Sequence, residues 1–152
     1  MKKIINLLSL IFLTSVLLTA QETASLNNET TVPTEHCTLT VELTNLESDK
    51  GQIMVGLYNS KGTWLNSNYK GELTTVQDGK ATVVFKNVPF GTYAISSVHD
   101  KDMDGKLKTG WFGIPKEPYA SSRGAKGRFG PPKWTDAVFT LSSKTSKEVI
   151  KF

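Results

Sequence analysis

The sequence predicts an all-β fold: a sandwich of about seven antiparallel strands, of the prealbumin or immunoglobulin type, with one long irregular loop over residues 100–134. Three observations predict it. Apolar and polar residues alternate with a period of two in several short segments, and turn signals rich in Gly, Asp and Pro separate these segments. No segment shows a convincing helical period. A closed barrel is the alternative, which this pattern does not separate from a sandwich.

The predicted strands lie at residues 38–44, 53–57, 72–77, 80–86, 93–98, 136–141 and 148–152. In the first strand Leu39, Val41 and Leu43 share one face, as in a half-buried strand. Asp78-Gly79 predicts a type I′ hairpin between the third and fourth strands, because both central residues of that turn need positive φ. Residues 88–91, with Pro second and Gly fourth, predict a type I turn before the fifth strand.

The first twenty residues have the pattern of a secretory signal peptide. Lys2 and Lys3 precede an apolar run that ends near the small residue Ala20, and this run is shorter than the ~20 residues that span a bilayer. Residues 21–35 are polar and without period, which predicts a disordered linker. We therefore expect an exported protein, periplasmic or extracellular, with a single domain at 36–152 and no transmembrane segment after cleavage.

Charge and cysteine content exclude some classes of protein. The formal charge of +4 includes Lys2 and Lys3, so it falls to +2 once the signal peptide is removed, and this is too little to indicate a nucleic-acid partner. Cys37 is the single cysteine, so an intramolecular disulfide is excluded, and its place beside an apolar alternation predicts burial.

The first part of the long loop resembles a calcium loop. Asp100, Asp102 and Asp104 stand at positions one, three and five, and Gly105 at position six allows the sharp turn. Position twelve, where a bidentate Glu belongs, is Trp111. The three aspartates are therefore candidate metal ligands, with calcium as the candidate cofactor and no other cofactor expected.

Two interpretations of this motif stay open. In one, Glu117, Asp136 or a backbone carbonyl completes a calcium shell of the weak extracellular class, with a Kd on the order of 10⁻⁴–10⁻³ M. In the other, the carboxylates cap backbone N–H groups in an Asp/Gly-rich turn.

The second part of the loop is basic and aromatic, a composition that suits an anionic or sugar ligand. The candidate ligand-binding residues are Trp111, Phe112, Arg123, Arg128, Phe129 and Trp134. The alternative is architectural: the rings cover one end or edge of the sandwich, because a loop of this length must bury something to stay ordered.

Five segments together resemble the bacterial domain-of-unknown-function 2141 family, in order and over nearly the whole mature chain. They are GQIMVGLYN at 51–59, FKNVPFGTYAI at 85–95, HDKDMDGKL at 99–107, WFGIPKE at 111–117 and FGPPKWTDA at 129–137. The resemblance implies an exported bacterial domain related to transthyretin-like and carboxypeptidase-regulatory-like sandwiches, without an established activity. The family pattern has an acidic residue where Lys108 stands and a Gly-rich, Asn-containing turn near 121–122, and these departures weaken a metal site carried over from the family.

The function we expect from the sequence is a non-catalytic binding or structural module of the bacterial cell envelope, braced by calcium if the motif binds it. Its partner would be an envelope protein, a glycan or a small anion. The alternative is a periplasmic hydrolase or a sugar- or anion-binding protein that uses the 100–134 loop. Catalysis is disfavoured because the chain has no Gly-x-Ser-x-Gly or His-Glu-x-x-His motif, and its histidines are His36 and His99.

Overall fold

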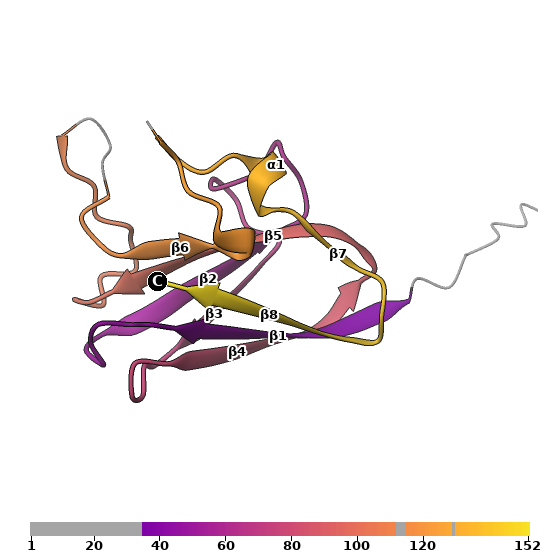
Figure 1. The fold of residues 1–152 in the computed structure, drawn as a ribbon, viewed down its shortest axis with the longest axis horizontal. Helices are drawn as coiled ribbons and strands as arrows, with labels where there is room; N and C mark the ends of the chain where they lie inside the picture. Colours follow the sequence, from indigo (N-terminus) through magenta and orange to yellow (C-terminus); the bar gives the residue numbers. More distant parts are fainter. Residues whose placement is uncertain (1–34, 112–114, 129) are drawn as a thin grey trace, which may run out of the picture. The chain divides into compact units, whose positions relative to one another are not determined.

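A computed structural model describes residues 35–111, 115–128 and 130–152 (Figure 1). The strands are β1 (His36–Thr44), β2 (Gln52–Tyr58), β3 (Lys70–Thr74), β4 (Ala81–Pro89), β5 (Gly91–Asp100), β6 (Tyr119–Ser121), β7 (Phe139–Leu141) and β8 (Thr145–Lys151). A 3₁₀ turn, η2 (Ser122–Gly124), and a single helical turn, α1 (Trp134–Ala137), complete the elements. The predicted signal peptide, the linker up to residue 34, Phe112 and Phe129 lie outside the described residues.

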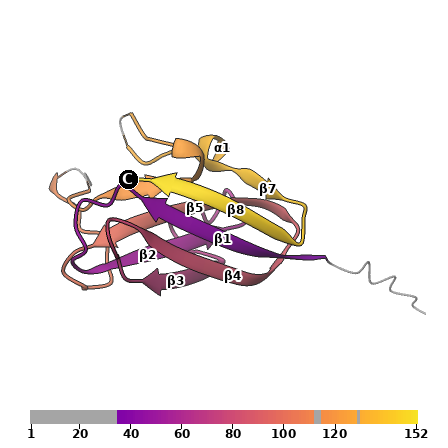
Figure 2. The same cartoon turned by 60° about the horizontal axis from the view of Figure 1, so that its bottom comes forward.

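The strands form two sheets that pack face to face. One sheet has the order β4-β1-β8, and the other has the order β3-β2-β5-β6 with β7 also paired to β5. Figure 2 brings the β4-β1-β8 sheet to the front, with β2 and β3 behind it. Because the buried side chains of both sheets belong to one apolar cluster, the predicted all-β sandwich is confirmed. In the part of the chain that the structure describes, none of the helices has the length and apolarity needed to span a bilayer.

The period-two pattern places the core as expected. The inward side chains are Leu39, Val41, Leu43, Val83, Phe85 and Ile150 from the first sheet and Ile53, Val55, Leu57, Tyr93 and Ile95 from the second. Cys37 is buried as predicted, and this burial raises the pKa of its thiol.

One pair of strands runs opposite to the prediction of an antiparallel sandwich. β8 lies parallel to β1, with Thr38 beside Thr145 and Thr44 beside Lys151. The physical reason is a crossover: β7 belongs to the other sheet, so the chain changes sheets before β8 and can enter in either direction. Side-chain alternation is the same in both directions and carries no information about this choice.

The predicted pairing of 72–77 with 80–86 is wrong, whereas the predicted positive φ at the turn is confirmed. β3 ends at Thr74 and pairs with β2, so only the bridge between Gln77 and Lys80 joins the two predicted strands. Asp78 and Gly79 do have positive φ, of 51° and 67°.

The prediction at 136–141 is corrected at its start, because α1 occupies Trp134–Ala137 and the strand covers only Phe139–Leu141. The long loop also contains a strand that the sequence did not predict. β6 is three residues long and pairs with Ser96–Val98 of β5. Such a short strand shows too little alternation to be recognised from sequence.

Candidate functional site

Residues 101–111 and 115–118 form the two arms of a hairpin-like extension between β5 and β6. Thr109 forms a bridge with Pro115 across it, and the Lys116 backbone N–H donates to the Lys108 carbonyl at 2.7 Å. The two arms are therefore paired between Lys108 and Lys116 and between Thr109 and Pro115.

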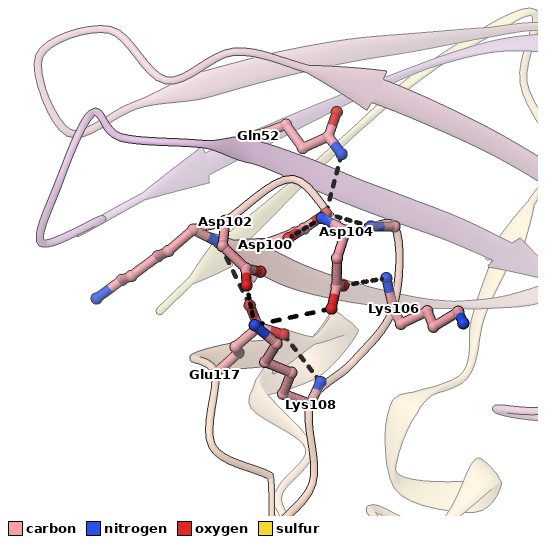
Figure 3. A network of polar contacts seen from close by, with 9 residues as sticks. Gln52, Asp100, Asp102, Asp104, Lys106, Lys108 and Glu117 are labelled. Carbon is pink, nitrogen blue, oxygen red and sulfur yellow. Dashed lines mark hydrogen bonds and ion pairs between the residues drawn. The ribbon is translucent and has the colours of Figure 1, made fainter.

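Asp100 anchors the base of this hairpin. Its carboxylate is fully buried and accepts hydrogen bonds from Gln52 Nε2 at 2.9 Å, Gly105 N at 2.9 Å and Asp104 N at 3.2 Å (Figure 3). The Gln52 amide lowers the pKa of Asp100 below its ordinary value, burial acts in the opposite direction, and the two backbone amides lower the pKa further. Asp100 is thus an ionised carboxylate satisfied by protein donors.

Glu117, from the returning arm of the hairpin, is a second carboxylate that accepts hydrogen bonds from backbone N–H groups. It is only 9% exposed, and its carboxylate accepts from Lys101 N at 3.3 Å and from Lys108 N at 2.9 Å. Asp100 and Glu117 together accept hydrogen bonds from four backbone N–H groups. The capping interpretation of the acidic motif therefore describes these two residues.

Lys108 supplies a positive charge inside the acidic cluster. Its ammonium group bonds the Asp102 carboxylate and lies 3.7 Å from Asp104 Oδ2 (Figure 3). Carboxylate oxygens of Asp100, Asp102 and Glu117 come within 4.8 Å of one another, a separation that would also suit a cation. A divalent ion at these oxygens has to compete with a lysine that the chain already places there.

The structure regroups the predicted metal ligands. Asp100 and Asp102 lie together as expected, and Glu117, one of the three groups expected to complete a shell, joins them. Asp104 instead contacts Lys108 and accepts from Lys106 N at 2.9 Å. Calcium binding by this cluster stays a prediction.

Replacing Lys108 with glutamine tests that prediction, because it removes the competing charge and keeps a polar side chain that is only one atom shorter. We expect about 10 mM calcium to raise the Tm of K108Q by roughly 6–11 °C, the shift that follows from a Kd on the order of 10⁻⁴–10⁻³ M. The wild-type Tm should move much less. Lys106→Gln, which removes the same charge from the same hairpin, is the control, and thermal scans with and without calcium provide the measurement. An equal rise in the wild type would show that Lys108 does not compete, and a rise in none of the three proteins would remove the calcium hypothesis.

A second cluster lies on the face of β5 that points away from the core. Trp134 of α1 meets Trp64, from the loop after β2, edge to face, with ring centroids 5.8 Å apart. Tyr58 also packs edge to face with Trp64, with ring centroids 4.9 Å apart, and Trp64 Nε1 donates to the Pro132 carbonyl at 2.8 Å. Figure 1 shows α1 beside this loop. We call Trp64 and Trp134 the tryptophan pair.

Small side chains allow the 122–138 segment to approach the sheet closely. Ala94 of β5, Ala125 and Ala137 form a buried cluster against which both tryptophans pack. Ser122 fastens this segment to the sheet: its buried hydroxyl accepts from Ile95 N at 2.9 Å and donates to the Ala137 carbonyl at 2.6 Å. The position of Trp134 therefore depends on a buried polar contact with β5.

A cavity of about 360 Å³ opens beside the tryptophan pair. Its lining consists of Lys61, Trp64, Lys133, Trp134 and Thr135. Both lysines are exposed and both tryptophans are half-buried. Its size falls in the range of small-ligand sites, and it combines flat apolar surface with two cations.

The structure separates the other predicted ligand residues. Trp111 is 88% exposed on the hairpin, far from covering an end of the sandwich. Arg123 lies near Glu148 of β8, where burial raises the pKa of the carboxyl group and the arginine charge acts against that rise. Arg128 lines a neighbouring cavity and is described below. Of the six predicted residues, only Trp134 lies in the tryptophan pair, while the positions of Phe112 and Phe129 are not described.

Trp64 and Lys61 are the site residues that sequence reasoning missed. They lie in the turn segment between β2 and β3, in the run Lys61-Gly62-Thr63-Trp64. The signal that could have identified them is a tryptophan in a short turn segment, where nothing local requires a large apolar side chain.

His99 is placed away from both clusters. It is fully buried on the core side of β5, its Nε2 lies 2.7 Å from the Lys50 carbonyl, and its ring packs edge-on against Phe152. A ring enclosed in this way cannot reach a substrate, which argues against His99 as a general base.

Comparison with known proteins gives one match. Residues 41–149 match the family described as "Uncharacterized protein conserved in bacteria (DUF2141)". No curated protein and no solved structure matches the chain. The matched range holds the described parts of the hairpin, the tryptophan pair, the six complete strands β2 to β7 and parts of β1 and β8, so the chain belongs to the DUF2141 family.

Proposed function

We propose that this chain is an exported, non-catalytic binding module of the bacterial cell envelope, and that it binds a sugar carrying a carboxylate in the cavity beside the tryptophan pair. The observation that carries the proposal is the lining of that cavity, which combines two indole rings with two exposed lysines.

The two kinds of side chain select for two features of the ligand. Indole rings offer flat apolar surface to the C–H face of a sugar ring, and removal of both surfaces from water stabilises the contact. Lys61 and Lys133 add a favourable interaction with an anionic group. A neutral sugar would use only the rings, and a small inorganic anion only the lysines.

Placement in the envelope is supported by the sequence. Lys2 and Lys3, the apolar run and Ala20 have the order of an export signal, and the family is bacterial. Within this proposal the acidic hairpin is a structural brace, with Lys108 or a calcium ion as its cation. The alternative of a hydrolase is less well supported, since His99, the histidine that precedes Asp100 in the sequence, is fully buried.

The test uses D-galacturonate and D-galactose, which differ in the carboxylate. We expect calorimetry to give a Kd for galacturonate on the order of 1 mM, as ~0.3 kcal/mol per non-hydrogen atom predicts for about 13 atoms. Trp134→Ala should weaken this binding at least about tenfold, because it removes one of the two rings. Lys61→Gln replaces an exposed side chain, so folding is not at risk. It should lower the affinity for galacturonate to a value close to the affinity for galactose.

Trp111→Ala is the matched control, because it removes an indole from the hairpin and leaves the cavity intact. Equal affinity for galactose and galacturonate in the wild type, or loss of binding in Trp111→Ala alone, would contradict the proposed site.

A further inference from the structure

A second cavity adjoins the one beside the tryptophan pair. It measures about 460 Å³, and its lining includes Lys126, Arg128, Pro131 and Asp136. Lys133 lines both cavities, so the two are neighbours along the 126–136 segment. A ligand that fills the first cavity can continue into the second without leaving the surface of the protein.

Basic side chains line both cavities. Lys61 and Lys133 line the first, and Lys126, Arg128 and Lys133 line the second. The side chains of Lys61, Lys126 and Lys133 are exposed, so each can meet an anion without a large cost of desolvation. Lysines in two adjoining cavities match a ligand that carries more than one negative charge.

Asp136 narrows the chemistry of the ligand. It is the acidic residue among those lining the second cavity, and its Oδ1 accepts from the Thr135 hydroxyl at 3.0 Å. A carboxylate beside cations accepts hydrogen bonds from hydroxyl groups, whereas a phosphate chain offers it no such donors and would use the cations alone. The ligand should therefore present hydroxyls as well as anions.

From these observations we infer that the two cavities form one extended site for an acidic polysaccharide, a chain of uronic acid residues. One residue stacks on the tryptophan pair, and its neighbours place their carboxylates along Lys133 and Lys126 and a hydroxyl against Asp136. This inference rests on the proposed function, because the first sugar occupies the cavity proposed there.

The experiment compares galacturonate with its linear trimer and with the methyl-esterified trimer, which keeps the rings and loses the charges. Calorimetry on the wild type should show the trimer binding at least about tenfold more tightly than the monomer, because it adds two carboxylates at cationic positions. The methyl ester should lose this gain. Lys126→Gln should lose part of the gain, because Lys133 remains, while leaving the affinity for the monomer unchanged.

Lys147→Gln is the matched control. Lys147 lies on β8 in the other sheet, paired with Glu42 at 2.7 Å, so its replacement removes the same charge away from both cavities. It should change neither the monomer nor the trimer affinity. Inorganic polyphosphate is the second comparison, and it should compete poorly with the trimer.

The outcomes distinguish failure of the extended site from failure of the proposed single-sugar site. Monomer binding without a gain for the trimer, or equal weakening of both by Lys126→Gln, would overturn the extended site and leave the single-sugar site intact. If polyphosphate displaces the trimer as effectively as a trimer with the same number of charges would, the extended site is also overturned. Binding would then reflect unselective attraction of anions. Absence of binding for monomer and trimer alike would overturn the proposed function itself.

Discussion

Replacing Ser122 with alanine is expected to destabilise the domain by about 2–4 kcal/mol, because two buried backbone groups lose their partner and each costs about 1–3 kcal/mol. The Ile95 N–H and the Ala137 carbonyl both bond the Ser122 hydroxyl in a region closed to solvent. Since Ala137 ends α1, the same change should loosen Trp134 and weaken binding of galacturonate. Urea denaturation measures the first effect and calorimetry the second.

Ser121→Ala is an unusually close control for this experiment. Ser121 is the preceding residue and is also buried, at 3% exposure, but its hydroxyl has no hydrogen-bond partner among the described residues. We expect its replacement to change the free energy of unfolding by less than about 1 kcal/mol. Equal losses in the two variants would show that crowding near η2, and not the Ser122 hydrogen bonds, accounts for the effect.

Replacing Asp100 with alanine is expected to cost about 2–4 kcal/mol as well, through the loss of hydrogen bonds from Gln52, Asp104 and Gly105 to a charged acceptor. The loss should be greatest in the hairpin, so amide exchange at Asp104 and Gly105 should accelerate more than exchange in the core strands. Hydrogen exchange followed by NMR, together with urea denaturation, measures both parts.

The pH dependence of stability gives an independent check on Asp100. Its folded-state pKa lies below the ordinary value of 3.8, so its contribution is fully present above that value and is lost as the pH falls through the folded-state pKa. The wild type should therefore lose stability below about pH 4 more steeply than Asp100→Ala does.

Asp104→Ala is the control for Asp100, since this exposed carboxylate on the same hairpin accepts from Lys106 N and contacts Lys108. Its replacement should change the unfolding free energy by less than about 1 kcal/mol. A loss equal to that of Asp100→Ala, or parallel acid profiles for wild type and Asp100→Ala, would contradict the role given to Asp100.

The sequence predicted the parts of the fold that local alternation controls. Leu39, Val41 and Leu43 face the core because a strand with one dry face must bury every second residue, and the same reasoning located Ile53, Val55 and Leu57. The direction of β8 and the partner of β3 were not predictable in this way. Both depend on where the chain crosses between sheets, and alternation does not record this.

Site residues could be predicted to lie together only where they are close in the sequence. Asp100 and Asp102 are two residues apart, so their proximity was visible, whereas the specific role of Glu117 required the hairpin to return. Trp134 was predicted and its partner Trp64 was not, because seventy residues of sequence separate two rings that meet only on the folded sheet. Ser122 gave no signal, since a serine that holds two elements together looks like any turn serine.

The most direct test of the binding site uses the three tryptophans of the chain, which the structure sorts into two environments. Trp64 and Trp134 line the cavity, and Trp111 is exposed on the hairpin. In a titration with galacturonate followed by NMR, we predict that the indole N–H signals of Trp64 and Trp134 shift together and saturate, while that of Trp111 stays in place. A shift confined to Trp111, or no shift at any of the three, would contradict the assignment of the ligand site to the tryptophan pair.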